Sequence, residues 1–388
     1  MQKKIIIISN NLHIGGVQKA LVNLLWNIRG RYDVTLLLFS KEGEYLQEIP
    51  PEVKLITTPS AYRFLGMTRS DVHCFGDKIG RSFFAAISRL FGRKYAIALM
   101  RIGQKKLNGY DVAISYLHNA GDKAFFGGCN DFLLNHVRAE TKITFLHCDY
   151  IRSGANTPDN NRMYTRFDVI AACSQGCADT FLKCNPELAK KVVIVPNCHR
   201  FDDIRGKALE EPVRLSDKKL NIVTIARLGN EKGVERALMA IADLGTKKEL
   251  LQYYVIGDGV QRKVIEQLIK ENGLATCVTL CGSLANPYGY LKAADLLLIP
   301  SYSEAAPLVV GEAVCLGTPI LSTETSSARE MIEKNGFGWV CENSTNAIGN
   351  ALHSLLMDDK VLTDVKCRLS EQTIDNSVAI SSFFRLMN

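Results

Sequence analysis

The chain alternates short, β-rich apolar runs with helical patterns along nearly its whole length, and no other feature constrains its fold as strongly. In the first half, runs that predict strands lie at residues 4–8, 33–39, 111–115, 142–146, 168–173 and 192–195. The second half repeats this rhythm at residues 221–226, 252–256, 277–280, 295–299, 319–322 and 339–341. Strands that alternate with helices form parallel sheets with helices on both faces. The sequence therefore predicts an α/β fold with two doubly wound, Rossmann-like domains.

The length of the chain and a break in its periodicity predict where the domains divide. A chain of 388 residues is longer than a single core usually supports. The polar, proline-containing stretch 200–219 interrupts the periodicity, so we expect a hinge there. The predicted domains are residues 1–202 and 203–369, followed by a final helix within 370–388. Because α/β sheets bind ligands outside the carboxyl ends of their strands, we expect the domains to face each other across a ligand cleft.

Composition excludes several classes of protein. The longest apolar runs are far too short to cross a bilayer, and the N-terminus has no signal-peptide pattern, so a cytoplasmic protein is expected. The twelve cysteines are scattered, without zinc-ligand spacing, so neither a metal site nor a disulfide framework is predicted. No recognised nucleic-acid-binding module accompanies the net charge of +7, and no nucleic-acid partner is expected.

The segment after the run 295–299 predicts an anion site at the start of a helix. Pro307 is expected at the first helical position, which would leave the backbone N–H groups of Leu308, Val309 and Val310 without partners inside the helix. Such N–H groups bind phosphate. Ala306 lies next to them in the preceding turn.

Two glutamates flank this helix start. Glu304 precedes the helix and Glu312 lies in its second turn, with seven residues between them. Carboxylates repel phosphate but accept hydrogen bonds from sugar hydroxyls. A ligand with phosphates between two polyols fits both observations, and a nucleotide sugar is such a ligand.

The Glu304-x7-Glu312 pattern, with Leu308, Val309 and Ala313 between and after the glutamates, resembles the motif of retaining glycosyltransferases of family 4, the group 1 type found in bacterial polysaccharide synthesis. This resemblance implies a GT-B fold of two Rossmann-like domains and transfer of a hexose or N-acetylhexosamine from a UDP-sugar. It also implies retention of anomeric configuration and no metal or other cofactor. Within this family the final helix returns to the N-terminal domain.

Further stretches of the second half resemble the same family. Arg227-Leu-Gly-Asn-Glu-Lys232-Gly matches its Arg-Leu and Lys-Gly positions, which implies that Arg227 and Lys232 converge on the donor diphosphate. Gly257 and Gly259 resemble its Gly-x-Gly turn near the nucleotide, whereas Arg262 stands where a dinucleotide fingerprint needs a third glycine. The resemblance places Ser283 and Leu284 beside the base. It also implies that the donor is bound by Ala306, Pro307, Leu308, Val309 and Glu312.

The first half supplies less specific matches. Gly15 and Gly16 lie between the first predicted strand and helix, where small residues let the backbone approach a phosphate or an acceptor closely. His147 follows the run 142–146 and matches the histidine that contacts the donor sugar in the family, so it is assigned a catalytic role with Arg227, Lys232 and Glu304. Asn197 matches a donor-binding position. Departures at Ala305-Ala306, Cys198-His199 and Ser326-Ser327 leave the identity of the sugar open.

A basic segment suggests where the acceptor comes from. Residues 61–107 contain ten lysines and arginines but only two acids, a net charge of +8, and within 81–107 the cations alternate with aromatic and aliphatic residues. Such a helix either lies on an anionic bilayer or forms a core helix with a charged rim. A lipid-linked saccharide acceptor and peripheral membrane contact are therefore expected alongside a plain saccharide acceptor.

Two other functions stay open at this stage. One is a catalytically silent GT-B scaffold subunit at the membrane, although such a protein has no need of the set Glu304, Glu312, Arg227 and Lys232. The other is an epimerase or a phosphorylase on the same fold. The sequence does not fix the oligomeric state, the acceptor or the linkage formed.

Overall fold

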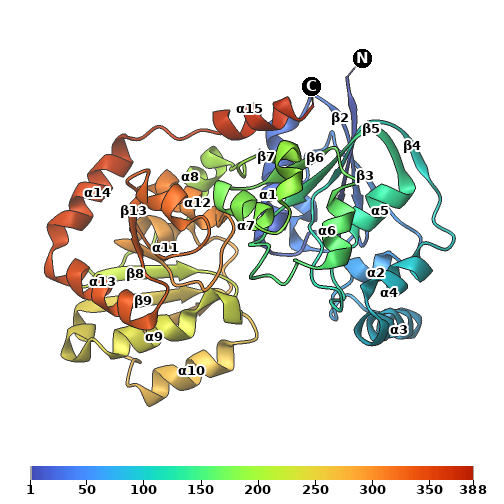
Figure 1. The fold of residues 1–388 in the computed structure, drawn as a ribbon. Helices are drawn as coiled ribbons and strands as arrows, with labels where there is room; N and C mark the ends of the chain where they lie inside the picture. The colour runs from blue at the N-terminus through green and yellow to red at the C-terminus, as the bar shows by residue number, and fades with distance from the viewer. Residues whose placement is uncertain (1, 388) are drawn as a thin grey trace. The chain divides into compact units, whose positions relative to one another are not determined.

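The computed structural model describes residues 2–387 and divides the chain into two compact units, each built around one parallel sheet (Figure 1). The N-terminal unit comprises Met1–Cys198 with Asn376–Asn388, and the C-terminal unit comprises His199–Asp375. The predicted α/β fold, with a parallel Rossmann-like sheet in each half, is confirmed.

The N-terminal unit has a seven-stranded sheet in the order β3-β2-β1-β4-β5-β6-β7. The strand β1 is buried beyond its first residue, since Ile5 to Ile8 have no exposed surface. The order reverses between β1 and β4, and loops at such a point in a parallel sheet commonly carry ligand sites. The strands are β1 (Lys4–Ser9), β2 (Asp33–Leu38), β3 (Lys54–Thr57), β4 (Leu107–Ser115), β5 (Val137–Leu146), β6 (Val169–Ala172) and β7 (Val192–Ile194). The helices are α1 (Gly16–Ile28), η1 (Glu44–Glu48), α2 (Arg63–Gly66), α3 (Phe75–Phe91), α4 (Arg93–Met100), α5 (Cys129–His136), α6 (Pro158–Tyr164), α7 (Gln175–Leu182), η2 (Pro186–Lys191) and α15 (Ser377–Arg385).

The C-terminal unit has a six-stranded sheet in the order β10-β9-β8-β11-β12-β13, with one apolar core on each face. The strand order reverses between β8 and β11, so the loops after these two strands lie side by side. The strands are β8 (Leu220–Ile225), β9 (Leu251–Ile256), β10 (Val278–Gly282), β11 (Leu296–Ile299), β12 (Ile320–Thr323) and β13 (Gly338–Cys341). The helices are α8 (Phe201–Glu210), η3 (Asn230–Lys232), α9 (Val234–Ala242), η4 (Gly245–Leu250), α10 (Arg262–Glu271), α11 (Tyr288–Ala293), α12 (Leu308–Leu316), η5 (Arg329–Glu333), α13 (Thr345–Met357) and α14 (Asp359–Glu371).

Every run predicted as a strand contains one, and the sequence pattern missed a single strand, β3. Its four residues, Lys54–Thr57, pair only with β2 at the edge of the sheet, and its two central residues are only partly buried. A strand this short and this exposed leaves almost no apolar run in the sequence.

The stretch 200–219, predicted as a hinge, instead begins with α8, a helix of the C-terminal unit. Asp202 and Asp203 occupy its first turn, where acidic side chains favour the helix dipole. Ile204 and Ala208 are buried against the core that also includes α11 and α12. The two units therefore divide between Cys198 and His199. The polar composition of the stretch reflects the solvent face of this helix.

The predicted helix over residues 370–387 is broken in the structure. The helix α14 ends at Glu371, and α15 begins at Ser377 as part of the N-terminal unit. Tyr32 contacts both Phe383 and Phe384 edge-on, at centroid distances of 6.5 and 6.1 Å. These aromatic contacts hold α15 on the N-terminal unit.

The basic segment forms the short helix α2 and then two longer helices, α3 and α4, rather than one helix. Gly92, at φ 100°, ends α3 and precedes α4, and only glycine adopts this conformation without strain. Among residues 2–387, no helix is long and apolar enough to cross a membrane.

Candidate functional site

The loops that follow β8 and β11 bring two of the predicted residues together in the C-terminal unit. The Nζ atom of Lys232 lies 2.8 Å from Oε1 of Glu304, although the two residues are 72 positions apart. The same carboxylate oxygen accepts a hydrogen bond of 2.7 Å from the hydroxyl of Ser301. With side-chain exposures of 24% and 12%, the pair is shielded but still reaches solvent.

A buried arginine on α9 fixes the loops around this pair. Arg236 is 3% exposed, and its Nε donates to the carbonyl of Pro300 at 2.6 Å. Its two terminal nitrogens donate to the hydroxyl of Thr323 at 3.2 Å and to the amide oxygen of Asn343 at 2.6 Å. One guanidinium thus connects the carboxyl ends of β11, β12 and β13. The sequence analysis did not identify Arg236, because its partners are 64 to 107 positions away.

Two glycines are required where these loops approach each other. Gly233 has φ 63°, and a Cβ there would lie 2.1 Å from the carbonyl oxygen of Pro300. Gly257 has φ 139°, and a Cβ there would lie 1.9 Å from the carbonyl oxygen of Ala226. A side chain at either position would therefore force the loops apart. At Gly259 a Cβ would lie 2.5 Å from the carbonyl oxygen of Leu228, so this loop also packs directly on the loop after β8.

The start of α12 differs by one residue from the prediction. Pro307 has ψ 123°, which places it outside the helix as its N-cap, and the helix begins at Leu308. The sequence predicted a free N–H group at Val310, but this group donates to the carbonyl of Pro307 at 3.2 Å. The backbone N–H groups of Leu308 and Val309 have no acceptor within residues 2–387. These two N–H groups, with no side chain capping them, are available to an anion.

Arg227 does not share the carboxylate that holds Lys232. Its Nη2 lies 2.8 Å from Oε1 of Glu231, and its side chain is 74% exposed. Burial raises the pKa of Glu231, but backbone hydrogen bonds and Arg227 outweigh burial and hold that pKa below its ordinary value. Convergence of Arg227 and Lys232 on one diphosphate stays a prediction.

The remaining predicted residues of this unit lie on neighbouring strand ends. Ser283 and Leu284 are exposed in the loop after β10. Glu312 is 4% exposed within α12, and Ala306 lies in the turn before that helix.

His199 is a second residue that the sequence analysis missed. It is buried, stacks on Phe201 at 5.1 Å, and its Nε2 donates to the carbonyl of Leu308 at 3.1 Å. A Cβ on Gly311 would lie 2.5 Å from this ring nitrogen. His199 therefore packs flat against the first turn of α12, which requires glycine at position 311.

In the N-terminal unit, His147 follows β5 and packs its ring against Tyr116 and Phe145, at 4.7 and 5.7 Å. Its Nε2 is buried and has no hydrogen-bond partner within residues 2–387, and the same holds for Nδ1 of His118, which follows the neighbouring strand β4. Burial lowers the pKa of His147 to about 3, with a contribution from His118, and burial lowers the pKa of His118 to about 4. Both rings are therefore neutral at pH 7.

The other predicted residues of the N-terminal unit lie at two further strand ends. Gly15 is the N-cap of α1 and Gly16 its first residue, after β1. Asn197, after β7, is partly buried.

These two histidines predict a loss of stability in mild acid. Below pH 6.5, a histidine whose pKa is depressed in the folded state takes up its proton only when the protein unfolds. Its contribution to the free energy of unfolding is therefore complete above pH 6.5 and is lost as the pH falls towards 4. We expect each to lower the free energy of unfolding of the N-terminal unit by about 1–2 kcal/mol between pH 7 and pH 5. Urea unfolding of a Trp339→Phe protein, followed through Trp26, measures this, and His147→Asn should flatten the pH dependence. If the free energy of unfolding depends on pH equally steeply with and without His147→Asn, the neutral state assigned to His147 is wrong.

Two solved structures resemble this chain over nearly its whole length. HepE from Anabaena, solved with UDP and glucose, superposes over all of both chains with a TM-score of 0.68 at 16% identity. WaaG, a glycosyltransferase involved in lipopolysaccharide biosynthesis, covers 98% of this chain and 99% of its own, with a TM-score of 0.64 at 16% identity. These likenesses establish the GT-B fold.

Sequence similarity covers about half of the chain. Residues 207–372, which include every loop of the C-terminal site, match the family model "Glycosyl transferases group 1". A Campylobacter jejuni transferase, N-acetylgalactosamine-N,N'-diacetylbacillosaminyl-diphospho-undecaprenol 4-alpha-N-acetylgalactosaminyltransferase, is 30% identical over 51% of this chain and 53% of its own. The colanic acid biosynthesis glycosyltransferase WcaL of Escherichia coli, assigned putatively, is 30% identical over 50% of this chain and 49% of its own. The chain thus spans about half the length of the curated relatives it matches, and its residues 207–372 are similar to the group 1 glycosyltransferases.

Proposed function

We propose that the chain transfers a hexose or N-acetylhexosamine from a UDP-sugar to a saccharide or lipid-linked saccharide acceptor, with retention of anomeric configuration, in bacterial cell-surface polysaccharide biosynthesis. The observation that carries this proposal is the Lys232–Glu304 ion pair of 2.8 Å, held in the family-matched segment beside the uncapped start of α12. A cation and two free N–H groups suit a diphosphate, and the glutamates suit sugar hydroxyls.

In this mechanism the residues of the C-terminal unit stabilise the leaving group. Lys232 and Arg227 neutralise the charge that develops on the departing diphosphate, and the N–H groups of Leu308 and Val309 donate to its oxygens. Glu304 orients Lys232 through their ion pair and accepts a hydrogen bond from the transferred sugar. Glu312 binds a hydroxyl of the donor. These charges and dipoles perform the role that a divalent metal has in other transferases.

Residues of the N-terminal unit complete the proposed mechanism. Gly15 and Gly16 approach the donor phosphate at the start of α1, and Asn197 binds the donor. His147 contacts the transferred sugar, and its depressed pKa keeps the ring neutral, so that one nitrogen donates and the other accepts a hydrogen bond.

The acceptor part of the proposal comes from α3 and α4. The large apolar side chains exposed on them, between 42% and 77%, are Phe75, Ile79, Phe83, Leu90, Phe91, Tyr95 and Leu99. They are interleaved with exposed lysines and arginines. We propose that this segment contacts the cytoplasmic face of the membrane, where a lipid-linked acceptor would lie. Arg93 is buried and bonded within the fold, so it does not belong to the membrane-facing cations as the sequence suggested.

Ligand-induced stabilisation tests the donor assignment directly. We expect UDP and at least one UDP-sugar to raise the unfolding temperature of the purified chain, because a ligand at about 100 times its Kd adds about 2.7 kcal/mol to the stability of the folded state. ADP, GDP and CMP serve as matched controls. Anomeric analysis of the product tests retention. Absence of stabilisation by every nucleotide indicates a silent scaffold, while epimerised sugar or phosphate-dependent release indicates an epimerase or a phosphorylase.

A further inference from the structure

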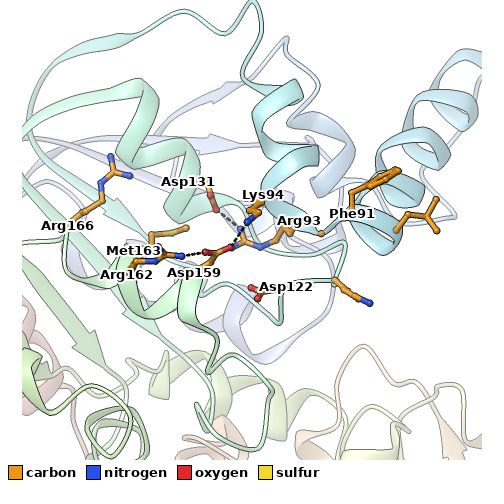
Figure 2. A pocket seen from close by; sticks show the side chains of 12 residues that line it. Phe91, Arg93, Lys94, Asp122, Asp131, Asp159, Arg162, Met163 and Arg166 are labelled. Atoms are coloured by element: carbon orange, nitrogen blue, oxygen red, sulfur yellow. Dashed lines mark hydrogen bonds and ion pairs between the residues drawn. The ribbon is translucent and has the colours of Figure 1, made fainter.

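A cavity of about 470 Å³ lies in the N-terminal unit, and none of the residues assigned above to the donor lines it (Figure 2). Its walls come from the junction of α3 and α4 at Gly92, from α6, and from the loop after β4 that contains Asp122 and Lys123. This volume lies within the range of small-molecule sites. The proposed donor chemistry leaves this cavity unexplained.

Positive charge predominates in the cavity. Five cations line it against three carboxylates, a surplus of two: Arg93, Lys94, Lys123, Arg162 and Arg166 against Asp122, Asp131 and Asp159. Asp159 is shared, since it lies 2.6 Å from Nη2 of Arg162 and 3.8 Å from Nζ of Lys94. Figure 2 shows Asp159 between these two cations. For Lys123 and Arg166, residues 2–387 provide no ion-pair partner. A cavity with surplus cations attracts an anion.

One of the cations is fixed in the wall by the fold. Arg93 is 4% exposed, and its Nη1 and Nη2 bond to Asp131 at 2.5 Å and to Asn160 at 2.9 Å. Its Nε is buried without a hydrogen-bond partner among the described residues. Asn160 is itself anchored through the carbonyls of Ala120 and Ala155. By contrast, the side chains of Lys94 and Arg162 are 61% and 78% exposed, so they can turn from Asp159 towards a ligand.

The rim of the cavity is apolar. Leu90 and Phe91, in the last turn of α3, line it and are 72% and 66% exposed. Further along the same helix, Phe75, Ile79 and Phe83 are also exposed. A ligand that meets both the cations and this rim must carry an anionic group and an apolar chain. Arginine forks and lysine point charges match phosphate oxygens.

We propose that this cavity binds the phosphate group of a lipid, with the lipid chain leaving across Leu90 and Phe91. The inference rests on the proposed membrane-facing function of α3 and α4, and it adds a second anion site to the chain. The phosphate belongs either to the diphosphate of a lipid-linked acceptor or to a phospholipid headgroup. Lys94, Lys123 and Arg162 provide its mobile contacts, and Arg93 holds the wall in place.

Vesicle binding tests the proposal with the full chain. The cavity variant is Lys94→Ser/Lys123→Ser/Arg162→Ser. The matched control, Lys41→Ser/Lys183→Ser/Lys190→Ser, removes the same charge from exposed positions of the N-terminal unit that lie outside the cavity and outside α3 and α4. Co-sedimentation is measured with phosphatidylcholine vesicles that contain a polyprenyl diphosphate or phosphatidylglycerol. We expect the cavity variant to bind about ten- to a hundredfold more weakly to at least one of these, and the control to bind much like the wild type.

The result distinguishes a lipid-linked acceptor from a phospholipid headgroup as the source of the phosphate. A loss confined to polyprenyl diphosphate assigns the cavity to the acceptor, and a loss on phosphatidylglycerol assigns it to headgroups. Equal weakening of the cavity variant and the control overturns the proposal, as does unchanged binding. Arg162→Ser alone, at an exposed position, repeats the test if the triple variant does not fold. Stabilisation by UDP is measured in parallel. Its absence in the wild type would contradict the donor assignment and leave the vesicle comparison intact.

Discussion

Replacement of Lys232 by alanine is expected to lower turnover with a UDP-sugar by about ten- to a thousandfold while the protein stays folded. The lysine lies 2.8 Å from Glu304 and at the end of the loop after β8, so its charge is already oriented when the donor arrives. A charge-assisted contact to the leaving diphosphate contributes about 1.5–4 kcal/mol, which corresponds to this range of rates. Initial rates at saturating acceptor measure the effect on kcat.

Two comparisons make the Lys232 result specific. Lys270→Ala removes an exposed lysine from the last turn of α10, elsewhere in the same unit, and should leave turnover unchanged. Glu304→Gln keeps the size of the side chain but removes the partner charge of Lys232, so it should also lower kcat. If Lys232→Ala transfers sugar as fast as the wild type, the proposed role of this lysine in leaving-group stabilisation is wrong.

The sequence predicted the fold well because its information is local. Each strand of a parallel sheet buried on both faces is a run of apolar residues, and such runs predicted every strand except β3. The two helical differences have local causes as well. The helix α8 was hidden by the charged residues on its solvent face, and the break between α14 and α15 separates residues that pack on different units.

Only those residues of the candidate site that belong to a sequence motif could be predicted. Glu304 and Lys232 were found from motif spacing, and the structure brings them together. Arg236 and His199 were not found, because each acts through carbonyl or side-chain oxygens more than 60 positions away, and such pairings leave no periodic pattern in one sequence. The only local signal for His199 was that it stands beside the position where the family commonly has glycine. The cavity of Figure 2 combines several segments of the N-terminal unit, and the sequence pattern indicated only the apolar residues on α3 and the basic residues on α4 that line it.

Arg236 is expected to be the residue on which the architecture of the C-terminal site depends most. Replacement by methionine keeps much of the volume but leaves the carbonyl of Pro300 and the amide oxygen of Asn343 without this donor. It also removes the cation that lies 3.9 Å from the ring centroid of Tyr302. We expect the free energy of unfolding of the C-terminal unit to fall by about 2–4 kcal/mol. The loop after β11 carries Glu304, so stabilisation by UDP should fall as well.

The two tryptophans allow this expectation to be tested within one chain. Trp339 lies on β13 beside both cores of the C-terminal unit, whereas Trp26 lies on α1 of the N-terminal unit. In a Trp26→Phe background, urea unfolding followed by fluorescence therefore reports the C-terminal unit. Arg262→Met is the matched control, because this arginine pairs with two carboxylates at the surface of the same unit, and its loss should barely move the transition. If Arg236→Met and Arg262→Met unfold at the same urea concentration, Arg236 does not hold the three strand ends together, and the order of the Lys232–Glu304 pair must come from its own loops.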